Sequence, residues 1–238
     1  MVKINKDGKY TPYPGVTVIA GIGDNDNEFW QTLYQKLNSS PLICKYFKPL
    51  PYQSYHMTTC NLYVKEWYFS RWSSFINQKL HFLQQLHVEL SKTPIIPEIT
   101  IEDLNVSDVL QLNVSLPPDQ EEEIKAVAKQ FGLEKKVPEY FHITLGYLYN
   151  FSINEEDFAA IKNECTEILA TCLKKEKLYL DSPQLTFFHS MKKFIPWDGK
   201  QNPFLESSSN QSTFFNSRQS ALSNIVSSFT SYVSQLLN

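Results

Sequence analysis

A short pattern, His-x-Thr, occurs twice in this chain, each time within a segment whose composition predicts a β-strand. The first copy is His56-Met-Thr58, and the second is His142-Ile-Thr144, which begins 86 residues later. Each copy follows an aromatic residue and is surrounded by β-branched and apolar residues. Residues i and i+2 of a strand point to the same face, so each histidine shares a face with its threonine.

The same order of elements is predicted around both copies: a strand, a helix and then the histidine-bearing strand. The first set extends over residues 16–63 and the second over residues 109–147, with almost no sequence identity outside the motif. This repetition predicts an α+β fold of two pseudo-two-fold symmetric lobes, with mainly antiparallel sheets and with helices outside them.

Alternation, periodicity and capping residues predict the individual elements. Strands are expected at residues 16–22, 41–47, 55–63, 95–106, 109–116, 141–147, 178–180 and 185–188. The first helix can be capped by Asp24 or Asp26, and a long amphipathic helix covers residues 72–90. Asp119 opens the third helix with Glu122 in a capping box, and Asn154 caps the fourth.

The two motifs together supply the groups that phosphoryl chemistry needs. An imidazole has an ordinary pKa near 6.5 and can accept or donate a proton at neutral pH. The threonine hydroxyls can donate hydrogen bonds to phosphoryl oxygens. Two such strands facing each other across a cleft would offer one base, one acid and two hydroxyl donors for in-line attack on phosphorus.

Composition narrows the class of ligand and the compartment. The net charge of −3 argues against a general nucleic-acid binder, but allows a small or short anionic ligand in a local pocket. The N-terminus has no apolar core of a secretory signal, and no apolar run reaches the ~20 residues of a membrane span. The four cysteines form no CxxC pair, which favours free thiols in a reducing compartment. We therefore expect a cytoplasmic protein that does not act on membranes.

The composition changes near the end of the chain. We expect residues 1–198 to form the two-lobed domain and residues 199–220, rich in Ser, Asn and Gln, to form a linker. Apolar residues at helical spacing predict an amphipathic helix over residues 221–238. That helix can pack on the domain or bind a partner, as in a pathogen effector exported by a non-Sec route.

Beyond the two motifs, four segments resemble a known family. They are Tyr-Pro-Gly-Val-Thr-Val-Ile at 13–19, Tyr-His-Met-Thr at 55–58, Phe-His-Ile-Thr-Leu at 141–145, and the run from Ser182 to Trp197. The paired motifs resemble the 2H phosphoesterase superfamily, which includes RNA-ligase-like (LigT-like) and cyclic nucleotide phosphodiesterases. The four segments together, over residues 10–198, resemble its DUF1868 branch.

The resemblance implies a bilobal fold with the motifs on opposite walls of a central cleft, no metal and no other cofactor. It implies His56 and His142 as the acid–base pair, with Thr58 and Thr144 binding phosphate. The implied substrate is a ribose-linked cyclic phosphate or a 2′,5′-phosphodiester of a small nucleotide or short oligonucleotide. Many RNA-processing members have a basic residue soon after the second motif, where this chain has Gly and Tyr147. That difference argues against a long nucleic acid, and Tyr147 can stack on a base or pack internally.

The remaining histidines are weaker candidates for the site. His87 falls on the apolar stripe of its helix and is expected to pack, whereas His81 falls on the polar face. His189 lies in a segment that the resemblance places near the cleft. A zinc site from His56, Cys60 and His142 would lack a closed ligand set with usual spacing, so no metal is expected.

Three functions stay open at this point. The first is a phosphodiesterase that uses both histidines. The second is a nucleotide-binding module that holds its ligand in the same cleft without turnover. The third is an interaction protein whose C-terminal helix binds a partner. The sequence does not assign the base and the acid, because the two motifs are nearly equivalent.

Overall fold

The computed structural model describes residues 2–24, 26–92 and 94–205. Residues 1–202 form one compact unit and residues 203–238 a second. The predicted linker falls largely outside the described residues, and the predicted C-terminal helix falls wholly outside them. The account below concerns the first unit. Within the described chain, no helix is long and apolar enough to cross a membrane.

In the described part of the chain, nine strands form a single sheet in which every pair is antiparallel. Its order is β7-β4-β5-β6-β3-β1-β8-β9, and β2 pairs separately with β6. The strands are β1 (Gly15–Gly21), β2 (Phe47–Pro49), β3 (His56–Val64), β4 (Glu98–Val106), β5 (Val109–Ser115), β6 (His142–Leu148), β7 (Lys177–Tyr179), β8 (Gln184–Phe188) and β9 (Phe194–Pro196).

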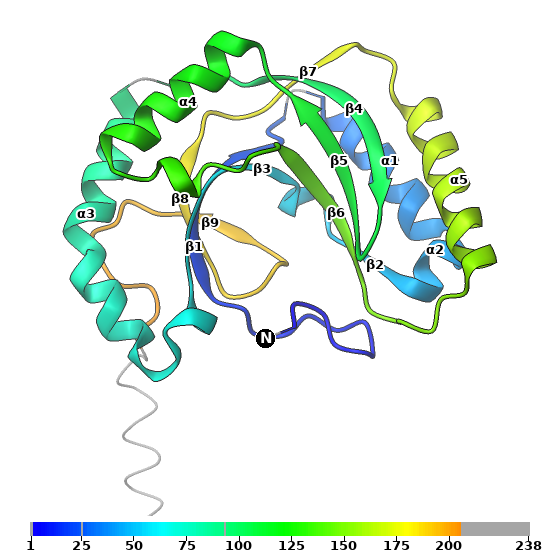
Figure 1. Ribbon diagram of the computed structural model, residues 1–238, viewed down its shortest axis with the longest axis horizontal. Coiled ribbons are helices and arrows are strands. Elements are labelled where there is room, and N and C mark those ends of the chain that lie inside the picture. Colours follow the sequence, from blue (N-terminus) through cyan, green and yellow to red (C-terminus); the bar gives the residue numbers. More distant parts are fainter. Residues whose placement is uncertain (1, 25, 93, 206–238) are drawn as a thin grey trace, which may run out of the picture. The chain divides into compact units, whose positions relative to one another are not determined.

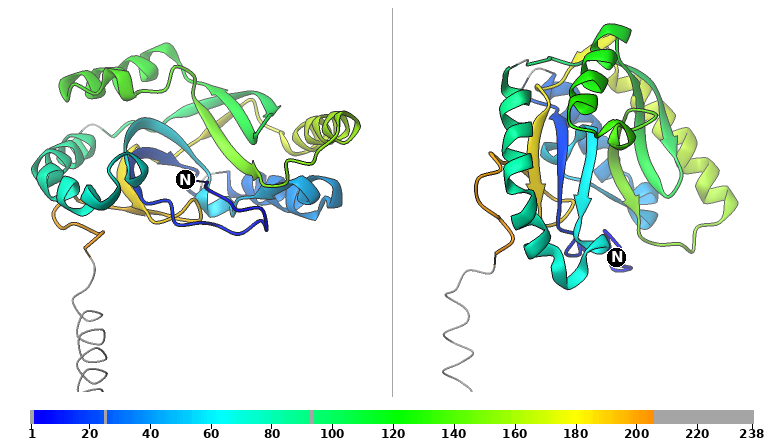
Figure 2. Two further views of the ribbon diagram at one scale, coloured as in Figure 1. Left: turned by 60° about the horizontal axis from the view of Figure 1, so that its bottom comes forward. Right: turned by 60° about the vertical axis from the view of Figure 1, so that its left-hand side comes forward.

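Among the residues that the structure describes, five α-helices flank this sheet in two groups (Figure 1). The helices α3 and α4 lie on one side of the molecule, and α1, α2 and α5 lie on the other (Figures 1 and 2). Their bounds are α1 (Asn27–Ser39), α2 (Pro41–Tyr46), α3 (Trp72–Lys92), α4 (Pro118–Gln130) and α5 (Glu155–Cys172). The predicted α+β class, with antiparallel strands and external helices, is confirmed.

The sheet contains two equivalent strand pairs that meet at its centre. β1 pairs with β3, which carries the first motif, and β5 pairs with β6, which carries the second. The two pairs join where Met57 of β3 lies opposite Ile143 of β6. Both residues are fully buried. A pseudo-two-fold axis at this contact relates one motif to the other.

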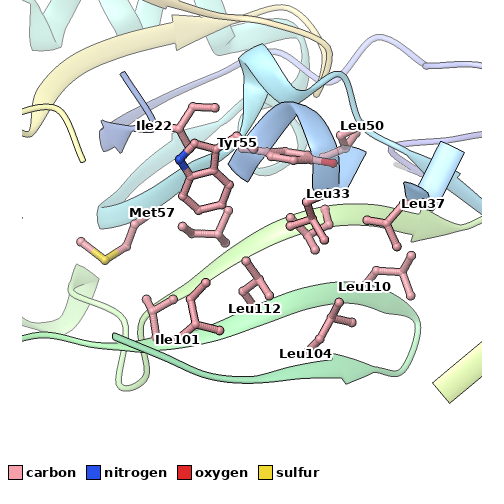
Figure 3. Close-up of a cluster of buried hydrophobic side chains, with 14 of the residues drawn as sticks. Ile22, Leu33, Leu37, Leu50, Tyr55, Met57, Ile101, Leu104, Leu110 and Leu112 are labelled. Carbon is pink, nitrogen blue, oxygen red and sulfur yellow. The ribbon is translucent and has the colours of Figure 1, made fainter. Parts of the chain in front are cut away.

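The connecting helices are exchanged between the two strand pairs. α1 follows β1, yet its Leu33 and Leu37 belong to the buried cluster that contains Leu110 and Leu112 of β5 (Figure 3). α4 follows β5, yet its Ile124 and Ala128 face residues of β1, β3 and α3 across a small apolar pocket. Each helix therefore helps to bury strands of the other repeat, and the two repeats share one core.

Two local predictions were wrong, and one short strand was missed. Residues 41–47 were expected to be a strand, but Pro41–Tyr46 is helical because the Ser40 hydroxyl accepts from the Ile43 N–H at 3.1 Å and proline begins the first turn. The expected capping box at Asp119 does not form, because α4 begins one residue earlier with Pro117 at its N-cap. The short strand β9 was not anticipated.

Candidate active site at the junction of the two histidine strands

The five residues predicted for the site line one cavity of roughly 290 Å³. They are His56, Thr58, His142, Thr144 and Tyr147. The neighbouring residues of both strands belong to the buried core that the helices cover, so period-two alternation places the histidines and threonines on the other face of the sheet. The sheet thus presents both motifs to the same cavity.

The strand register places the histidine of each motif beside the threonine of the other motif. Because β3 and β6 are antiparallel and meet at the Met57–Ile143 contact, His56 lies alongside Thr144, and Thr58 lies alongside His142. Each imidazole therefore has a hydroxyl from the opposite motif next to it. A phosphoryl group at the junction would have a histidine on each side.

Each imidazole is oriented by a carbonyl two residues earlier in its own chain segment. His56 Nδ1 lies 2.7 Å from the Ser54 oxygen, and His142 Nδ1 lies 3.3 Å from the Tyr140 oxygen. A carbonyl can only accept, so Nδ1 is the donor and carries the proton in both contacts. In the neutral imidazole this leaves the Nε2 lone pair available for proton transfer.

The environment of His56 favours its neutral form. Burial lowers the pKa of His56 to about 4, although its hydrogen bond to the Ser54 carbonyl favours the protonated form. The charges of His142 and Lys3 also lower this pKa. The ring of Phe194 lies against the imidazole, with 4.0 Å between the ring centroids. His56 is therefore uncharged at neutral pH and able to accept a proton.

The two threonine hydroxyls lie at the wall of the cavity. Thr58 and Thr144 are both half-buried at the cavity wall. Within the described part of the chain, neither hydroxyl hydrogen-bonds to a protein group. Their donors are therefore available to an anionic oxygen between the two strands.

Tyr147 combines packing with a polar contact. Its hydroxyl accepts a hydrogen bond from Lys3 Nζ at 3.2 Å and donates to the Met191 sulfur at 3.5 Å. From the sequence, Tyr147 was expected either to stack on a base or to pack internally. Neither expectation included a contact with Lys3, which also lines the cavity. No motif in the sequence marked this lysine, which lies far from both histidines along the chain.

Aromatic side chains form much of the remaining wall of the cavity. They come from Tyr13, Tyr63, Trp67, Phe188 and Phe194. Trp67 is 54% exposed, which leaves its ring accessible from solvent. Tyr13, Phe188 and Phe194 fall within the segments that carry the family resemblance, and this was the signal that could have identified them.

The other candidate residues lie elsewhere. His81 and His189 are exposed and His87 is half-buried, and none of the three lines the cavity. Cys60 is buried on the opposite side of the sheet, where it lines the apolar pocket beneath α3 and α4.

A β-bulge explains the position of this cysteine. Thr58 pairs with Ile19 and Cys60 pairs with the adjacent Val18, so Thr59 is an extra residue and the alternation of faces shifts. Burial also raises the pKa of the Cys60 thiol to about 12, which disfavours the thiolate that a metal would need. Among the described residues, no group of three or more His, Cys, Asp and Glu side chains is arranged to hold a metal ion.

Comparison with known proteins agrees with the resemblance. Residues 3–102 match the family described as 2H-phosphodiest, Domain of unknown function (DUF1868). The matched region contains β1, β3 and the first motif, and the structure adds the second motif to the same cavity. A curated relative is the uncharacterized protein 127L of Invertebrate iridescent virus 6. It is 27% identical over 223 residues, covering 82% of this chain and 94% of that protein.

Two solved structures are also similar. The conserved protein of unknown function ATU0111 from Agrobacterium tumefaciens str. C58 aligns with a TM-score of 0.58 and 16% identity, over 82% of this chain and 89% of that one, and so shares the fold. Usb1 from Kluyveromyces marxianus aligns with a TM-score of 0.41 and 11% identity, over 78% of this chain and 98% of that one. By the sequence match, residues 3–102 of this chain are similar to the 2H-phosphodiest (DUF1868) family.

Proposed function

We propose that this protein is a metal-independent phosphodiesterase that acts on a ribose-linked cyclic phosphate or a 2′,5′-phosphodiester. The observation that carries the proposal is the crossed arrangement at the junction of β3 and β6, where two imidazoles and two hydroxyls line one cavity. The match of residues 3–102 to this family supports a phosphodiesterase-type activity.

The environment of His56 favours one assignment of the roles of the two histidines. His56 is neutral at neutral pH and accepts the proton of the attacking water as the new P–O bond forms. His142, on the other side of the junction, acts as an imidazolium and donates its Nε2 proton to the ribose oxygen as the old P–O bond breaks, which leaves His142 neutral. The hydroxyls of Thr58 and Thr144 donate to the non-bridging oxygens as negative charge increases on them.

The cavity favours a small nucleotide or a short oligonucleotide as the substrate. Its volume of roughly 290 Å³ is at the lower end for sites of small ligands. The aromatic side chains of its wall can pack against a nucleobase, as aromatic residues do in single-strand recognition. A long duplex would need a basic surface, which a chain of net charge −3 does not favour.

The test is turnover of 2′,3′-cyclic nucleotides and 2′,5′-linked dinucleotides by wild-type protein and single histidine variants. We expect His56→Ala and His142→Ala to lower kcat by about 10²–10⁴-fold, the usual contribution of a positioned acid or base. The matched control is His81→Ala, because His81 is an exposed histidine outside the cavity.

Two outcomes would contradict the proposal. Rates close to wild type in either motif variant would mean that paired acid–base catalysis does not occur at this site. Tight binding of these nucleotides by wild-type protein without any turnover would favour the alternative function, a nucleotide-binding module.

A further inference from the structure

The described side chains that line the cavity include basic groups but no acidic ones. Among the described residues that line it, Lys3 is the only lysine or arginine, and none is an aspartate or glutamate. None of the described carboxylates forms an ion pair with Lys3. An unpaired cation in the cavity of an acidic protein would attract an anion.

The backbone around Lys3 is held in a tight N-terminal hairpin, residues 2–11. Ile4 bridges to Tyr10, and the Thr11 N–H donates to the Lys3 carbonyl at 3.1 Å. Gly8 turns the hairpin in the left-handed region, with φ +71°. The position of Lys3 is therefore fixed by its own segment and does not depend on a ligand.

The lysine side chain is also held in place. Its ammonium lies 4.7 Å from the ring centroid of Tyr147 and 5.6 Å from that of Tyr13. It donates one hydrogen bond, to the Tyr147 hydroxyl. An ammonium carries three donors, so two are left for a ligand.

We propose that Lys3 is the anion-binding residue of this site and that its ammonium contacts the phosphoryl oxygens of the bound substrate. This inference rests on the proposed function and adds a residue from the N-terminal hairpin to it. The threonine hydroxyls are neutral donors, whereas Lys3 supplies the positive charge that a phosphodiester anion requires. The charge of Lys3 also reaches His56, whose pKa it helps to lower, which places the ammonium within electrostatic range of the reacting groups.

The experiment measures binding of inorganic phosphate to the full chain at neutral pH by calorimetry, without any turnover. Lys3→Met keeps the aliphatic part of the side chain and removes the charge, and Lys3→Arg keeps the charge. We expect Lys3→Met to weaken phosphate binding about tenfold or more, as is typical for loss of a charge-assisted hydrogen bond. Lys3→Arg should stay within a few-fold of wild type.

The matched control is Lys6→Met, which removes an exposed charge from the same hairpin and should leave binding unchanged. Binding to wild type should also weaken as salt is added, and this dependence should be smaller in Lys3→Met. A role confined to packing against the tyrosines would give neither the rescue by arginine nor the change in salt dependence.

Wild-type affinity in Lys3→Met, or no phosphate binding by wild type, would overturn the inference. These outcomes are distinct from failure of the proposed function. Phosphate binding that depends on Lys3, without turnover of any diester, would refute the enzyme and keep the anion site. Turnover that needs both histidines but not Lys3 would keep the enzyme and refute the role of the lysine.

Discussion

Mild acid should destabilise the folded protein through His56. Burial lowers the pKa of this imidazole to about 4 in the folded state, against 6.5 for an ordinary histidine in the unfolded chain. Between these two values the unfolded chain binds the proton and the folded chain does not. The free energy of unfolding must therefore fall as the pH falls from about 6.5 toward about 4.

The size of the effect follows from the two values. At about pH 5 an ordinary imidazole is almost fully protonated, whereas a group with a pKa of about 4 is roughly one-tenth protonated. Integrated from about pH 7.5 down to about pH 5, the difference in proton binding lowers the free energy of unfolding by about 2 kcal/mol. This is a large fraction of the 5–15 kcal/mol that typically stabilises a domain.

The measurement is urea denaturation at several pH values between about 5 and 7.5, on wild type and on His56→Gln. Carboxylates also contribute to acid destabilisation, so only the difference between the two proteins is informative. The neutral variant should lose about 2 kcal/mol less than wild type over this range. His81→Gln replaces an exposed histidine and should follow wild type.

The same loss in His56→Gln as in wild type would refute the reasoning, because the proton would then bind elsewhere. A direct NMR titration gives an independent check on the folded protein. An imidazole of His56 that titrates near 6.5 would show that burial does not disfavour its charged form.

Four further outcomes are expected. Activity should persist in EDTA, because proton transfer by two imidazoles needs no bound metal; loss on chelation that zinc or magnesium restores would contradict this. The pH profile of kcat/KM should have two limbs, each lost in one of the histidine variants, and the acidic limb should lie below the usual imidazole range because the pKa of His56 is lowered to about 4. Thr58→Ala and Thr144→Ala should each cost about 1–3 kcal/mol of transition-state stabilisation without moving these limbs, and steady-state kinetics across the same pH range would check both effects. Gly15→Ala should lower the free energy of unfolding by about 1–3 kcal/mol, because the new Cβ would lie 2.3 Å from Cζ of the buried Phe188 ring. Urea denaturation measures this change, and an unchanged midpoint would show that the ring can move aside.

The location of the two motifs was predictable because it depends on local pattern. Alternation along a strand places His56 with Thr58 whatever the rest of the fold does, and the repeated order of elements indicated that the second motif would have an equivalent position. The helix at Pro41–Tyr46 was not identified, because a short apolar run fits a strand or a helix equally well. The cap at Ser40 decided between them.

Features that depend on tertiary structure could not be predicted from the local sequence pattern. The bulge at Thr59 shifts the alternation of β3, so a regular period-two pattern would assign Cys60 to the wrong face. Lys3 reaches the cavity only because the N-terminal hairpin lies next to Tyr147, a contact between residues that are 144 positions apart. No periodicity in a single sequence encodes such a contact.

The exchange of helices between the two strand pairs has a consequence for how this chain can fold. Neither repeat can bury its own strands alone, since α1 covers β5 of the second repeat and α4 packs near β1 and β3 of the first. A fragment that ends at Val106 would keep α1 but lack β5, and would expose the apolar side of α1 that β5 helps to bury. We therefore expect the two halves to be unstable when expressed separately and to regain structure only when mixed. In the intact chain, the β3–β6 contact that joins the two repeats also brings the two motifs together, so we expect the cavity to form only when the repeats have assembled.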